Sequence, residues 1–104
     1  MAGVELSENT LRLVRHIFPP EHHAAVFATL EHRCGSSLPL WAVPTPEGLE
    51  RIRFALLKLS SGSLAELERA VAIANTDWRD VLVAAGFGDA LQAHIDWLDT
   101  QLHA

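Results

Sequence analysis

The residues best suited to chemistry lie together in one short run, Asp77-Trp78-Arg79-Asp80. Two carboxylates beside a guanidinium suit acid–base catalysis with a histidine, or the binding of a charged ligand. The same run also suits a structural role, since an acid in the first turn of a helix is stabilised by the helix dipole. The structural interpretation is favoured, and it pairs Asp80 with a base on another helix. Two arginines are candidates for that base: Arg51 and Arg53.

Histidines form a second group of candidates, because four of the six lie between residues 16 and 32. A zinc site needs three or four converging nitrogen or sulfur ligands. The set that two helices could supply is His16, His22 and His23. Consecutive helical residues point about 100° apart, and neither an HExxH nor a CxxC spacing occurs. We therefore predict histidines at the helix surface, with no metal and no cofactor.

The single cysteine, Cys34, lies near the end of a predicted helix on the same face as Phe27 and Leu30. The C-terminal end of a helix disfavours a thiolate, so a reactive nucleophile is not expected there. We predict a small buried side chain. One cysteine also excludes a disulfide within the chain.

Arg51 and Arg53 flank the apolar stripe of a predicted helix, and Glu47 precedes Arg51 by four residues. This spacing predicts an exposed ion pair on the helix surface. A clamp for a phosphate or carboxylate is the alternative, although no glycine-rich loop supports it.

Two tryptophans are candidates for recognition. Trp41 lies in the apolar loop 36–44, which we expect to lie across the core; if exposed, it would mark an interface. Trp97 lies off the stripe formed by Ile95 and Leu98, near His94. An off-stripe tryptophan of this kind predicts a contact with a protein partner or with a second copy of the chain.

Glycine and proline divide the chain into segments in which apolar residues recur at helical spacing. The predicted helices cover residues 8–18, 20–34, 46–60, 64–75, 77–85 and 89–102. No stretch alternates with period two for long enough to predict a strand. The sequence therefore predicts an all-α, compact bundle of five to six short helices, forming a single domain over 1–104.

Polar residues before the apolar runs predict where four helices begin, because their side-chain oxygens accept bonds from first-turn amides. The predicted caps are Ser7, Thr45, Ser63 and Thr76. Ser63 and Glu66 also have the spacing of a capping box, in which each side chain bonds the other residue's amide.

Two stretches carry a resemblance: FPPEHHAAVFATLEHRCGSSLP and TPEGLERIRFALLKLSSGSLAELERAVAIANTDWRDVLVAAGFG. They resemble small uncharacterised bacterial proteins with a cysteine-glycine-x-x-leucine-proline turn and an aspartate-tryptophan-arginine-aspartate helix start. The resemblance covers most of residues 18–88. It implies a bacterial, cytosolic, helical domain and no particular activity.

Charge and hydropathy narrow the function classes. The net charge of −5 disfavours binding to nucleic acid, and four acidic residues without a compensating base follow Arg79. No apolar run approaches the ~20 residues of a membrane span, and the first residues lack the pattern of a signal peptide. We therefore predict a cytoplasmic, non-enzymatic interaction or regulatory module. The alternative is a small ligand-binding protein or acid–base enzyme that uses Asp77, Arg79 and Asp80 with a histidine.

Overall fold

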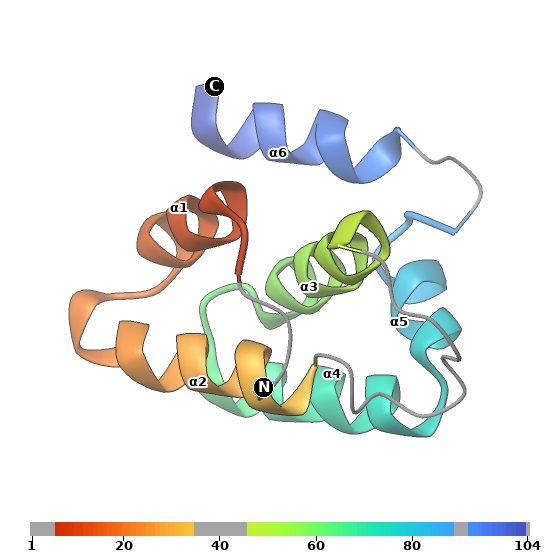
Figure 1. Ribbon diagram of the computed structural model, residues 1–104, viewed down its shortest axis with the longest axis horizontal. Helices are drawn as coiled ribbons and strands as arrows, with labels where there is room; N and C mark the ends of the chain where they lie inside the picture. The colour runs from red at the N-terminus through yellow and green to blue at the C-terminus, as the bar shows by residue number, and fades with distance from the viewer. Residues whose placement is uncertain (1–5, 35–45, 89–91, 104) are drawn as a thin grey trace.

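The computed structural model describes residues 6–34, 46–88 and 92–103. Within these ranges the fold is all-α, as predicted, and contains no strand. Figure 1 shows the α-helices and one short 3-10 helix. Their bounds are α1 Glu8–Ile17, η1 Pro20–His22, α2 His23–Arg33, α3 Pro46–Ser60, α4 Leu64–Thr76, α5 Trp78–Ala84 and α6 Ala93–His103. The single-domain prediction over 1–104 includes residues outside the described ranges and stays a prediction.

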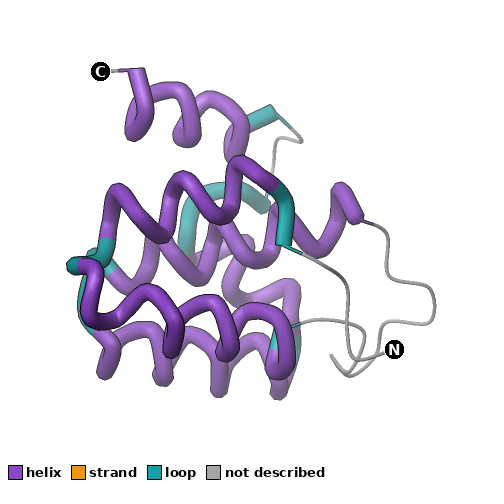
Figure 2. Tube along the Cα trace, turned by 60° about the vertical axis from the view of Figure 1, so that its left-hand side comes forward, coloured by secondary structure: helices purple, strands orange, loops and turns teal. Residues whose placement is uncertain are grey.

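The bundle is arranged around α3. Figure 1 shows α6 on one side of this helix and α2 with α4 on the other. α3 contacts α1, α4, α5 and α6, and its side chains are buried at every position from Ile52 to Leu57. Figure 2 shows the same helices from a second direction. A helix buried on all sides in this way serves as the scaffold on which the outer helices are placed.

Most helix boundaries agree with the predicted ones, and the differences have local causes. The predicted helix 20–34 is split, because Pro20–His22 form a 3-10 turn before α2 begins. α6 begins at Ala93 rather than at 89, and the carbonyl of Gln92 accepts bonds from the amides of Ile95 and Asp96. None of the described helices has the length and apolar content needed to cross a membrane.

Two predicted caps are confirmed. The Ser7 hydroxyl accepts a bond from the Thr10 amide, and the Ser63 hydroxyl accepts one from the Glu66 amide. The predicted bond from the Ser63 amide to the Glu66 carboxylate is not formed. The Ser63 amide donates instead to the Ser60 carbonyl, and the Glu66 carboxylate accepts from Arg69. Thr45 lies outside the described residues.

The predicted cap at Thr76 is wrong. Thr76 is the last residue of α4, and its hydroxyl donates to the Ala72 carbonyl at 3.0 Å. The chain becomes extended one residue later, at Asp77, whose carboxylate accepts from the Arg79 amide and caps α5.

The turn between α3 and α4 is tight. Ser61 and Gly62 both adopt positive φ, at 48° and 83°. Gly62 lies against the end of α1, where a Cβ atom would come within 2.9 Å of the Ile17 carbonyl oxygen. This close approach brings the end of α1 beside the end of α3.

Candidate ligand pockets

The Asp77–Asp80 run is partly exposed, and its charged side chains are bonded mainly within the run. The Asp77 carboxylate caps α5 and also accepts two bonds from the Arg79 guanidinium, each at 3.1 Å. These bonds lower the pKa of the Asp77 carboxyl below its usual value. Trp78 is half-buried and packs against the core. The run therefore forms a cap with its own ion pair, and no pocket described below includes it.

The predicted pairing of Asp80 with an arginine of α3 is wrong. Asp80 is exposed on α5, whereas both arginines bind backbone carbonyls. A terminal nitrogen of Arg51 donates to the Phe87 carbonyl, and Arg53 Nε donates to the Cys34 carbonyl at 3.1 Å. The α3 arginines therefore tie other segments of the chain to the central helix.

Arg53, predicted to flank the apolar stripe of this helix, is instead buried in the core. It is 2% exposed, because α3 is covered on every side and has no solvent face at that position. Cys34 beside it is fully buried, as predicted. Burial raises the pKa of the Cys34 thiol to about 12, so this side chain belongs to the core and is no nucleophile.

The three candidate metal-ligating histidines are not brought together. His23 Nε2 donates to the Phe18 carbonyl at 2.7 Å, and its ring packs near Phe27. His22 lies in the 3-10 turn, and His16 lines a pocket near α6. In the described part of the chain, no three His, Cys, Asp or Glu side chains are placed to share a metal ion.

α6 packs along α3, and the two helices run in the same direction. Aromatic side chains make much of the contact between them. His94 and Trp97 both contact Phe54 of α3 and Phe87 after α5, with ring centroids 5.7 to 6.3 Å apart. These four residues are called the aromatic cluster below. The cluster corrects the expectation that Trp97 points away from the core: α6 is rotated so that His94, Trp97 and Leu98 face α3.

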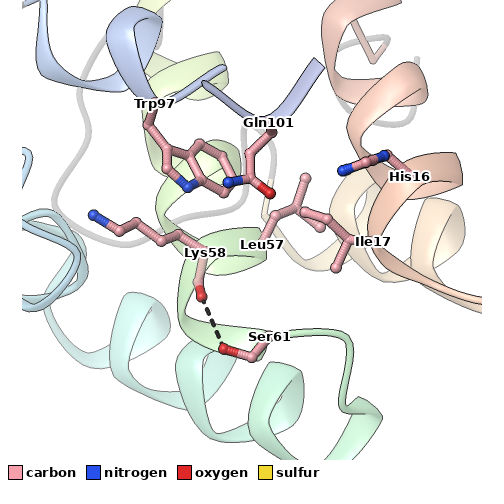
Figure 3. Close-up of a pocket in the computed structure, with 7 residues that line it drawn as sticks. All are labelled: His16, Ile17, Leu57, Lys58, Ser61, Trp97 and Gln101. Carbon is pink, nitrogen blue, oxygen red and sulfur yellow. Dashed lines mark hydrogen bonds between the residues drawn. The ribbon is translucent and has the colours of Figure 1, made fainter. Parts of the chain in front are cut away.

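A pocket of about 470 Å³, the large pocket below, lies on one side of the aromatic cluster. Figure 3 shows Trp97 and Gln101 over Leu57, with His16 and Ile17 on the opposite side from Lys58. Three helices and one turn thus meet at this pocket. Its lining residues are His16, Ile17, Leu57, Lys58, Ser61, Trp97 and Gln101.

None of the described residues that line the large pocket is acidic. Its apolar wall is made by Trp97, Leu57 and Ile17, and its polar groups are an imidazole, an amide, a hydroxyl and an ammonium. The ammonium of Lys58 is fixed at the edge, because Nζ donates to the Ala85 carbonyl at 2.7 Å. It also lies 5.0 Å from the centre of the Phe87 ring.

A smaller pocket of about 280 Å³, the small pocket below, lies on the other side of the aromatic cluster, near the start of α3. It is lined by Glu47, Gly48, Arg51 and His94. The predicted ion pair between Glu47 and Arg51 is not among the ion pairs of the described residues. Arg51 instead donates a hydrogen bond to the carbonyl of Phe87, which follows α5.

The candidate residues are therefore divided between sites. His16 and Trp97 share the large pocket and Arg51 lines the small one, whereas the Asp77–Asp80 run lies apart. Trp41 and the loop 36–44 lie outside the described residues. Among the residues that sequence reasoning missed, Lys58 carried a signal as the chain's single lysine, whereas Gln101 and Ser61 carried none.

No protein-family model, no curated protein and no solved structure matches this chain closely enough to indicate a relationship. The resemblance to small bacterial helical proteins stays a prediction.

Proposed function

We propose that this chain is a binding protein that takes a small amphipathic molecule into the large pocket. The observation that carries the proposal is the pocket itself, which joins an apolar wall to several polar groups at about 470 Å³. Sites for small organic molecules are commonly about 300–1,000 Å³, with mostly apolar walls and a few polar groups.

The lining indicates the kind of molecule. Trp97 and Leu57 suit an aromatic or alicyclic ring, and Gln101 and Ser61 suit polar substituents. The described lining residues include no acid, and Lys58 carries a positive charge at the edge, so a neutral or anionic molecule is favoured over a cation. We propose binding rather than catalysis, because the Ser61 hydroxyl bonds the Lys58 carbonyl and is not hydrogen-bonded to a general base among the described lining residues.

The test uses anilinonaphthalene sulfonate, an aromatic anion whose fluorescence rises in an apolar site. Gln101→Trp fills the pocket, so we expect it to weaken binding of the probe at least ~10-fold, equivalent to ~1.4 kcal/mol. Thr100→Trp is the matched control, because Thr100 is exposed on the same helix and does not line the pocket. Fluorescence titration measures both affinities, and near-UV circular dichroism checks that packing is intact.

Equal loss of binding in both tryptophan variants would contradict the proposal, as would an undiminished affinity in Gln101→Trp. The proposal would also be contradicted if the probe bound only to protein that had lost its near-UV circular dichroism signal. The fluorescence would then report loosened packing and not a formed pocket. A cytoplasmic location and a bacterial origin remain parts of the proposal.

A second candidate function is self-association through α4. Ile73 is 40% exposed beside a hollow of about 210 Å³, formed by α3, α4 and α5. Glu66 and Arg69 lie on the same side of α4 and form an ion pair there. In a two-fold interface the same patch meets itself, so antiparallel α4 helices could exchange these charges between copies.

Ile73→Asp tests this candidate, because a carboxylate in the middle of an apolar contact is left without water or a partner. We expect wild-type protein to form a dimer in sedimentation analysis and Ile73→Asp to be monomeric. Val83→Asp is the control: Val83 is 70% exposed but does not line the hollow. A monomeric wild type at high protein concentration, or equal dissociation of both variants, would exclude the α4 interface.

A further inference from the structure

The small pocket contains a charged group with an unused donor. Arg51 Nε is buried and has no hydrogen-bond partner among the described residues. A terminal nitrogen of the same guanidinium donates to the Phe87 carbonyl, which fixes the plane of the group. A buried N–H of an ionised group costs more free energy when it lacks an acceptor than an ordinary bond contributes. The site therefore calls for an acceptor that the described residues do not supply.

The residues that line the small pocket together with Arg51 fix its shape. The His94 ring is oriented by its contacts with Phe54 and Phe87, and it forms one wall. Gly48 forms another wall without a side chain, so the backbone of α3 is accessible there. Apart from the guanidinium, these walls are mostly carbon.

The charges select among possible anions. A guanidinium binds a carboxylate through two parallel N–H bonds, and this geometry suits a carboxylate or a phosphate equally. Glu47 also lines the pocket and is exposed at its edge. Its negative charge opposes a dianion more strongly than a monoanion, which favours a carboxylate over a phosphate.

We propose that the small pocket binds the carboxylate of a short aliphatic acid through Arg51. The volume of about 280 Å³ lies just below the range typical of larger organic ligands, so a short acid fits it. The carboxylate accepts from Arg51 Nε, and the aliphatic part lies against the His94 ring. This site is separate from the large pocket and does not depend on the function proposed there.

The test uses butyrate, with butyramide as its uncharged isostere and inorganic phosphate as the competing anion. In ¹⁵N–¹H spectra of the full chain, we expect butyrate to shift the Arg51 Nε–H signal saturably, with a Kd at or below ~1 mM. Butyramide and phosphate should bind at least ~10-fold more weakly. An unmoved Nε–H signal, or equal affinities for butyrate and butyramide, would overturn the proposal. Tighter binding of phosphate would overturn the assignment to a carboxylate.

Arg51→Lys supplies the matched variant, because it keeps the positive charge and a donor for Phe87 but removes Nε. We expect at least ~10-fold weaker binding of butyrate in Arg51→Lys. Arg79→Lys, at an exposed position on α5, should bind as wild type does. Gln101→Trp should also bind butyrate normally, which separates this site from the large pocket. Should Arg51→Lys fail to fold, the Nε–H shift in the wild-type spectrum decides the question without it.

Discussion

Replacing Phe54 with alanine is expected to lower the free energy of unfolding by about 3–5 kcal/mol. Phe54 is fully buried on the central helix, and its ring contacts both His94 and Trp97. Removing the ring takes away buried apolar surface and leaves a cavity between α3 and α6 that neighbouring backbone cannot fill. Because α6 packs on α3 largely through these rings, the docking of α6 should weaken most.

Urea titration followed by circular dichroism measures the change, and the melting temperature should fall by roughly 4–8 °C for each kcal/mol. Val83→Ala is the control: Val83 is 70% exposed, so its truncation should change stability by less than ~0.5 kcal/mol. A cost below ~2 kcal/mol for Phe54→Ala would mean that the aromatic cluster is not packed as described.

The second large effect is expected for Gly62→Ala, which should lower the free energy of unfolding by about 2–3 kcal/mol. Gly62 has a φ of 83°, a conformation that alanine adopts only at a cost. The added Cβ would also lie 2.9 Å from the Ile17 carbonyl oxygen. The position of the Cβ is fixed by the backbone at residue 62, and the Ile17 oxygen is itself a backbone atom. No side-chain rotation can relieve the contact, so the end of α1 has to move away from the α3–α4 turn.

Gly86→Ala separates these two causes. Gly86 has almost the same φ, 81°, but the atom nearest to a new Cβ is Lys58 Nζ at 3.8 Å, an ordinary van der Waals distance. We expect this variant to lose only the conformational part, about 1–2 kcal/mol. Thermal unfolding of both variants tests the contact, and equal losses would show that the approach of α1 to Gly62 has no energetic weight.

Much of the fold could be predicted because its signals are local. Helix α3 matches its predicted bounds, and Ser7 and Ser63 cap α1 and α4 as their spacing indicated. Such features depend on residues three or four positions apart. Thr76 was mispredicted for the same reason, since both it and Asp77 suit an N-cap and the choice depended on where α4 ends.

The pockets could not be predicted, because each combines residues from helices far apart in the sequence. Arg53 illustrates the difficulty: a single stripe placed it at the edge of α3, yet four helices pack around α3. The nearly continuous apolar run from Ile52 to Leu57 was the available signal for a helix buried on all sides. Trp97 was misplaced because the face of α6 is decided by the rings of Phe54 and Phe87, and no spacing within α6 encodes them.

α6 supplies a wall to both pockets, through His94 on one side of the aromatic cluster and through Trp97 and Gln101 on the other. A ligand in either pocket would add contacts to α6 only while that helix is docked, and so would protect it against local unfolding. Amide hydrogen exchange along α6 should therefore slow when either ligand is bound, although none of the described side chains lines both pockets.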